Sequence, residues 1–116
     1  MIKVARGDSK TIQITVRDKF GDLAPFDLTG AIVYFTVKKT IAETDASAVI
    51  AKTSDGGGIT IISAANGEFD IELTPGDTSI TPMEYVFDVR IAKSGSVYSM
   101  EEPDIFKISP VVRRAI

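Results

Sequence analysis

Three carboxylates at alternate positions, Glu68, Asp70 and Glu72, form the densest group of chemically competent side chains in the sequence. On a β-strand they would lie on one face about 7 Å apart, because a strand rises about 3.3 Å per residue. They could hold a hard cation only if further oxygens converged from a neighbouring strand. A glycosidase pair would need a cleft and one desolvated acid. The alternation favours a solvated outer face and leaves a cation site as the open alternative.

The chain contains no histidine and no cysteine, which removes most catalytic and metal-binding chemistry. Histidine is the commonest general base near neutral pH, and cysteine supplies thiolates and disulfides. A serine nucleophile would need a lysine base, and no Ser-x-x-Lys element with a supporting pattern is present. The glycine run Asp55-Gly56-Gly57-Gly58 leads into a strand pattern, whereas a phosphate loop leads into a helix. We therefore expect no enzyme activity, no cofactor and no metal, apart from the cation that the three carboxylates leave open.

Length and charge narrow the classes further. The 116 residues, 44% hydrophobic and 25% charged, predict one globular domain over 1–116. Residues 1–58 carry eight basic and seven acidic groups and residues 59–116 carry five and nine, which argues against a nucleic-acid partner. No apolar run approaches 18 residues, so we expect no membrane span. No apolar segment follows Met1–Arg6, so we expect no signal peptide.

Hydrophobic alternation predicts an all-β fold organised around residues 84–91. Tyr85, Phe87, Val89 and Ile91 recur at a period of two and predict one buried face. Further strands are expected at 2–4, 10–17, 31–38, 48–52, 59–62, 67–73, 97–100 and 105–108, the last as an edge strand interrupted from its predecessor by Pro103. Residues 40–52 give the weakest pattern, a loop with a helical turn and then a short strand. The fold class predicted is an immunoglobulin-like antiparallel β-sandwich of seven to eight strands with at most one short helical turn.

Turn residues support this assignment. Asn66-Gly67 and Ser94-Gly95 predict hairpins, and Thr74 to Asp77 predicts a capped helical turn over 75–79. Tyr85 follows that turn and suits a tyrosine corner, with its hydroxyl bonded to the preceding backbone. Arg6-Gly7-Asp8 matches an integrin-ligand triplet, but Gly-Asp is an ordinary turn pair before a strand. In the loop 24–30, Asp27 predicts a side-chain turn and Leu28 a plug into the end of the sandwich.

Five apolar residues do not fit the alternation that predicts the buried face of each strand, and we take them as the candidate interface: Ile32, Tyr34, Ile62, Val86 and Tyr98. One hypothesis is that several of them form a patch buried against another subunit. The other is that loops of the same chain cover them. Tyr34 and Tyr98 could alternatively stack on a sugar, which would make the protein a carbohydrate-binding or adhesion module.

The order of the turn and strand motifs carries a family resemblance. The motifs are Arg6-Gly7-Asp8-Ser9, Asp27-Leu28-Thr29-Gly30-Ala31, Gly58-Ile59-Thr60-Ile61, Gly67-Glu68-Phe69, Leu73-Thr74-Pro75-Gly76-Asp77-Thr78, Tyr85-Val86-Phe87-Asp88-Val89 and Gly95-Ser96-Val97. Together they resemble the small immunoglobulin-like proteins encoded among phage and prophage structural genes. The chain is similar in particular to the N-terminal domain of phage baseplate upper proteins. It departs from that pattern just before Tyr85, where a glycine is replaced by Met83 or Glu84.

The resemblance implies a non-enzymatic virion component of the tail, baseplate or head–tail region. Its partners would be other phage structural proteins or further copies of itself, without nucleic acid or membrane. Its location would be the virion, assembled in the cytoplasm of the bacterial host.

Overall fold

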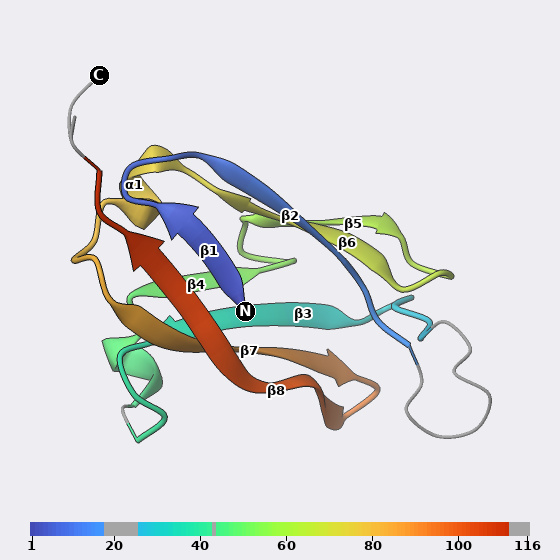
Figure 1. Cartoon of the computed structure of the whole chain (residues 1–116). Coiled ribbons are helices and arrows are strands. Elements are labelled where there is room, and N and C mark those ends of the chain that lie inside the picture. The colour runs from blue at the N-terminus through green and yellow to red at the C-terminus, as the bar shows by residue number, and fades with distance from the viewer. Residues whose placement is uncertain (18–25, 43, 112–116) are drawn as a thin grey trace.

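The computed structural model describes residues 1–17, 26–42 and 44–111 and shows an immunoglobulin-like β-sandwich (Figure 1). A five-stranded sheet has the order β1-β8-β7-β3-β4, and a three-stranded sheet has the order β2-β6-β5. The elements are β1 (Ile2–Ala5), β2 (Lys10–Thr15), β3 (Ile32–Lys38), a 3₁₀ turn η1 (Asp45–Ser47), β4 (Ile50–Thr53), β5 (Ile59–Ser63), β6 (Glu68–Leu73), α1 (Pro75–Thr78), β7 (Glu84–Lys93) and β8 (Ser96–Ser109). The predicted fold class is confirmed.

The core lies between the two sheets and is built by alternation. Tyr85, Phe87, Val89 and Ile91 of β7 are all buried, as the pattern predicted. Each such side chain contributes about 1.5–3 kcal/mol when it leaves water. Phe87 lies with its ring centroid 5.7 Å from that of Phe35 in β3 and 6.5 Å from that of Phe106 in β8. The inner face of the five-stranded sheet therefore carries a connected aromatic cluster.

The local turn chemistry follows the sequence closely. Thr74 caps α1 by accepting a hydrogen bond from the Asp77 amide, and the Asp77 carboxylate accepts one from the Thr74 amide, which completes a capping box. The Tyr85 hydroxyl donates to the carbonyl of Thr81 at 2.6 Å, so the predicted tyrosine corner forms despite the missing glycine. Ser94 and Gly95 both have positive φ, which a two-residue β-hairpin requires.

The turn before β6 packs closely against the residues that follow β2. Gly67 has a φ of +70°, and a Cβ there would lie 2.5 Å from the carbonyl oxygen of Val16. The side chain of Leu28 is almost fully buried, and the Asp27 carboxylate accepts a hydrogen bond from the Thr29 amide at 2.9 Å. The plug and the side-chain turn are thus confirmed. Residues 24 and 25 of the predicted loop 24–30 lie outside the described residues.

Two predictions about the last strand are wrong. β8 runs without interruption from Ser96 to Ser109, and β1 pairs with it in parallel, so β8 is not an edge strand. Pro103 is tolerated because it falls where the β7–β8 ladder shifts register, between the pairs Phe87–Asp104 and Val89–Glu101. A bulge leaves its extra residue outside the hydrogen-bond ladder, so the missing N–H of proline costs no ladder bond there.

The weakest sequence assignment is close to the structure. Residues 44–49 form a loop that contains η1, and the strand that follows begins at Ile50, two residues later than predicted. β4 pairs with β3 and is an edge of the five-stranded sheet.

Candidate protein-contact surface

The structure places three of the five candidate interface residues on the same face of one sheet. Ile32 and Tyr34 of β3 and Val86 of β7 alternate with buried neighbours and point away from the core. They lie on the outer face of the five-stranded sheet. Tyr34 is 37% exposed, and Ile32 and Val86 are half-buried.

The other two candidates lie elsewhere. Ile62 is 54% exposed but belongs to β5 of the three-stranded sheet, where the register shifts between Ile61 and Ser63. Tyr98 is opposite Ile91 in the β7–β8 ladder and so shares the inner side of the sheet. Its ring packs edge to face on Phe26, with centroids 5.4 Å apart.

The separation of the tyrosines bears on sugar binding. Tyr34 is on the outer side of the five-stranded sheet, whereas Tyr98 is at the end of the sandwich on the inner side. Lys93 also approaches the Phe26 ring, with its Nζ 5.6 Å from the centroid. The two tyrosines therefore do not form one aromatic platform.

Two exposed residues that the sequence analysis did not select complete the outer surface. Val97 of β8 pairs with Ala92 and is 56% exposed, and Ile105 pairs with Val86 and is 36% exposed. Directly paired residues project to the same side of a sheet, so both belong to the outer side. We call this surface the β3–β7–β8 face and define it by Ile32, Tyr34, Thr36, Lys38, Val86, Asp88, Arg90, Ala92, Val97 and Ile105.

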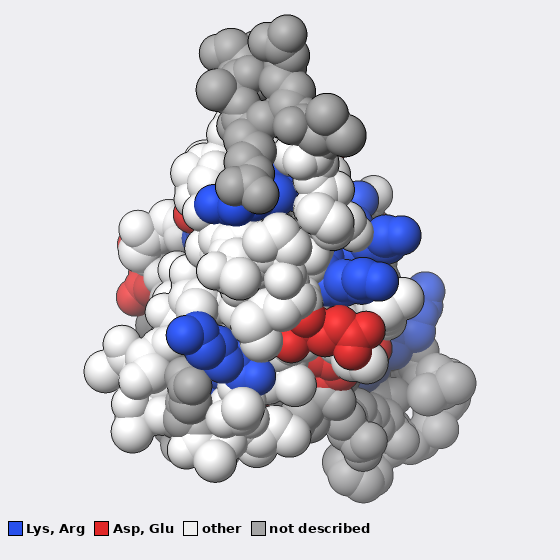
Figure 2. Space-filling view, turned by 60° about the vertical axis from the view of Figure 1, so that its left-hand side comes forward, with Lys and Arg blue, Asp and Glu red and all other residues white. Residues whose placement is uncertain are grey.

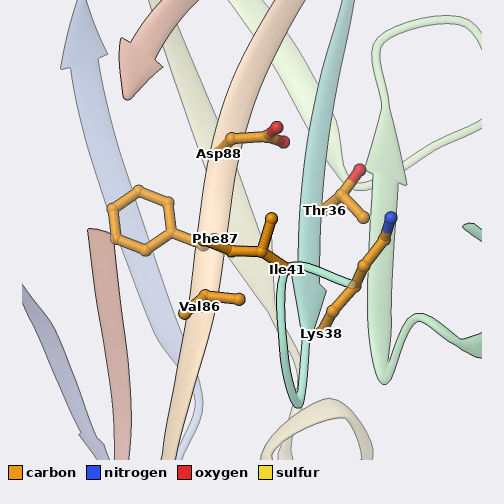
Figure 3. A pocket seen from close by; sticks show the side chains of 6 residues that line it. All are labelled: Thr36, Lys38, Ile41, Val86, Phe87 and Asp88. Atoms are coloured by element: carbon orange, nitrogen blue, oxygen red, sulfur yellow. The ribbon is translucent and has the colours of Figure 1, made fainter. Parts of the chain in front are cut away.

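The middle of this face is hollowed. A depression of about 410 Å³ is lined from β3 by Tyr34, Thr36 and Lys38, from β7 by Asp88, Arg90 and Ala92, and from β8 by Val97. A smaller hollow of about 60 Å³ lies beside it, where Ile41 approaches Val86 (Figure 3). In that view the Phe87 ring extends to the opposite side of β7 from the Asp88 carboxylate.

Two opposite charges stand beside each other in the centre of the face. Asp88 pairs with Thr36 and Arg90 pairs with Tyr34 in the β3–β7 ladder. Asp88 is half-buried and Arg90 is exposed. Two ion pairs join described residues elsewhere in the molecule, that of the N-terminus with Asp104 and that of Lys52 with Asp77, and Asp88 and Arg90 are in neither of them.

The three acids of β6 point away from the core, as predicted. Glu72 is exposed, and Glu68 and Asp70 are half-buried. Asp70 lies opposite Gln13 on one side and Thr60 on the other, and its Oδ1 is buried without a hydrogen-bond partner. Among residues 1–17, 26–42 and 44–111, no three acidic, histidine or cysteine side chains converge as metal ligands would. The view in Figure 2 shows both charge signs interspersed with broad uncharged areas.

A charged contact between the sheets was not anticipated from the sequence. Lys52 of β4 donates to the carboxylate of Asp77 in α1 at 2.7 Å, and both side chains are mostly buried. Burial alone would raise the pKa of Asp77, but the hydrogen bonds from Lys52 and Thr74 outweigh it and lower that pKa below its usual value. This ion pair links β4, an edge strand of the five-stranded sheet, to α1, which follows β6 of the three-stranded sheet.

The remaining perturbed groups have structural causes. The pKa of Asp27 is lowered by hydrogen bonds from the Thr29 hydroxyl and amide, and that of Asp104 by the N-terminal ammonium and the Ile105 amide. Desolvation raises the pKa of Tyr85, against a smaller opposing effect of Arg6. These shifts hold the two acids ionised in turns and the phenol neutral in the corner.

No helix in the described segments is long and apolar enough to cross a membrane.

Comparisons with known proteins add little to this description. No protein-family model matches the chain, and no curated protein matches its sequence. Among solved structures, the chain shows a weak similarity to AggA, the major subunit of aggregative adherence fimbriae type I from Escherichia coli. The two share 10% identity over 95% of this chain and 89% of AggA, with a TM-score of 0.32. A likeness at that level carries no inference about function.

Proposed function

We propose that the protein is a non-enzymatic structural or assembly component of a phage or prophage virion, acting through protein–protein contacts. The observation that carries this proposal is the β3–β7–β8 face, where exposed Tyr34, Val97 and Ile105 surround the opposite charges of Asp88 and Arg90. Aromatic and apolar side chains beside arginine are the composition that protein interfaces favour.

The position of this face in the fold supports a contact role. β7 and β3 are interior strands of the sheet, so their backbone groups are already paired and the surface is held rigidly by the core beneath it. A rigid surface loses little conformational entropy when a partner covers it. The placement in a virion is inferred from the resemblance to small immunoglobulin-like proteins of phage structural genes, in the tail, baseplate or head–tail region.

The carbohydrate-binding alternative depends on Tyr34 and Tyr98 acting together. Because they lie on opposite sides of the five-stranded sheet, no observation favours that alternative, and we propose no second function.

The experiment that tests the proposal is detection of the protein in purified particles. The strain that carries the gene is induced to release phage, the particles are banded on a density gradient, and an antibody to this chain probes the fractions. We expect the chain to band with the particles, and we expect portal, terminase or tail genes beside its own gene. Intact particles that lack the chain, from a lysate that contains it, would refute the virion role.

A further inference from the structure

We infer that the partner that covers the β3–β7–β8 face is a second copy of this chain, packed face to face about a two-fold axis. The inference rests on the proposed function, because it names the partner of the same surface. Its evidence is the arrangement of charge and apolar side chains, which is complementary to itself when the face is turned by 180°.

The central charges set the position of the axis. Asp88 and Arg90 project from the same side of β7 about 7 Å apart, two residues along one strand. An axis that lies in the interface, perpendicular to β7 and level with Val89, brings Asp88 of each copy opposite Arg90 of the other. Two reciprocal ion pairs then form at the centre, as an isologous interface requires. A register that covered both charges and left them unpaired would be costly.

The same axis brings apolar groups together at both ends of the face. Val86 and Ile105 are directly paired at one end, and Ala92 and Val97 are directly paired at the other. Both pairs lie three residues of β7 from Val89, so the rotation places one pair over the other. Ile41, which stands beside Val86, meets the Ala92 end of the second copy.

The same rotation places a side chain of the second copy in the larger depression of the face. Across β3, the residue opposite Arg90 is Tyr34 and the residue opposite Asp88 is Thr36. The axis therefore carries the Tyr34 side chain of each copy over Thr36 of the other, into the depression of about 410 Å³ that Thr36 lines. The ring then lies against the apolar parts of the lining, and its hydroxyl lies near the polar groups of that depression.

The size of the face agrees with a modest homodimer. The three strands of this face, β3, β7 and β8, cover a projected area of roughly 500 Å², from strand spacings of about 4.8 Å and rises of about 3.3 Å per residue. Specific interfaces bury roughly 800 Å² of accessible surface per partner, and a surface with side-chain relief has more accessible area than its projection. Two sheets of this kind stack about 10 Å apart with their strands within about 30° of each other.

Charge reversal of the full chain tests the inference by sedimentation velocity. We expect the unaltered protein to dimerise at about 50 µM, within the micromolar range that weak specific interfaces reach. Asp88→Arg alone and Arg90→Asp alone each place like charges opposite each other, so each should weaken self-association at least about 100-fold. An equimolar mixture of the two variants should form a heterodimer, and the double variant Asp88→Arg/Arg90→Asp should regain self-association.

The mixture separates a charge effect from misfolding, because two unfolded variants would not rescue each other. Glu72→Arg, on the outer face of the three-stranded sheet, is the matched control and should leave the dimer unchanged. A strictly monomeric unaltered protein, single reversals that dimerise normally, or variants that fail to associate when mixed would each overturn the second-copy inference. The virion role is judged by particle composition, so the two can fail separately.

Discussion

The two faces of β7 differ in what they determine. The inner face carries Tyr85, Phe87, Val89 and Ile91, all buried in the core, whereas the outer face carries Val86, Asp88, Arg90 and Ala92, of which none is fully buried. One strand thus serves stability on one side and contact on the other. Because inner and outer positions alternate along β7, substitutions two residues apart should affect the same property, either stability or association. Substitutions at adjacent positions should affect different properties.

The largest expected effect is loss of the inner aromatic cluster. Phe87→Ala removes a ring that contacts both Phe35 and Phe106 and should lower the free energy of unfolding by about 3–5 kcal/mol. Val86→Ala, the adjacent outer position, should cost less than about 1 kcal/mol, because its side chain is only half-buried. Urea midpoints of the two variants measure the contrast directly. Equal midpoints would contradict the division between the faces.

A second expected effect concerns the ion pair between β4 and α1. Asp77→Asn removes the ion pair with Lys52 and should cost about 1–2 kcal/mol at pH 7. The pKa of Asp77 is lower in the folded chain than in the unfolded chain, so its contribution is full above the unfolded pKa and is lost as the pH falls through the folded pKa. The difference between Asp77→Asn and the unaltered protein in urea should therefore shrink from pH 7 to about pH 3. Asp55→Asn, in an exposed turn, is the control and should show no such change.

The tyrosine corner gives a smaller inner-side effect. Tyr85→Phe keeps the buried ring but removes the hydroxyl that donates to Thr81, so it should cost about 0.5–1.5 kcal/mol. Tyr34→Phe removes a hydroxyl from a side chain that is 37% exposed on the outer face, where water can solvate the group, and should leave the thermal midpoint unchanged. A corner variant as stable as the unaltered protein would show that the hydroxyl exchanges its bond for water without loss.

Local chemistry explains which features the sequence could predict. The core face of β7, the capping box at Thr74 and the hairpin at Asn66-Gly67 depend on residues close in the chain, and all three are present. Leu28 could be predicted as buried because it is an apolar residue within a polar loop, and its side chain is stabilised only if the loop turns it into the core.

Features that depend on register could not be predicted in this way. Tyr98 lies on the inner side because of its pairing with Ile91, and Ile62 belongs to the other sheet. The β8 bulge that accommodates Pro103 depends on its position against β7. The ion pair between Lys52 and Asp77 joins segments of different sheets, and no local pattern relates them.

The smallest effect on the free energy of unfolding is expected for Tyr34→Lys, a substitution that should strongly weaken self-association. Tyr34→Lys replaces a side chain on the outer face, so the free energy of unfolding should change by less than about 0.5 kcal/mol. The same change removes the aromatic group that occupies the hollow of the second copy and adds two like charges to the dimer, which should weaken self-association roughly tenfold or more. Thr11→Lys adds the same charge at an exposed position of β2, in the three-stranded sheet, and should leave the dimer intact. Urea unfolding and sedimentation of both variants separate the two faces of the sheet: a Tyr34→Lys protein that is destabilised yet still dimeric would reverse the roles assigned to them.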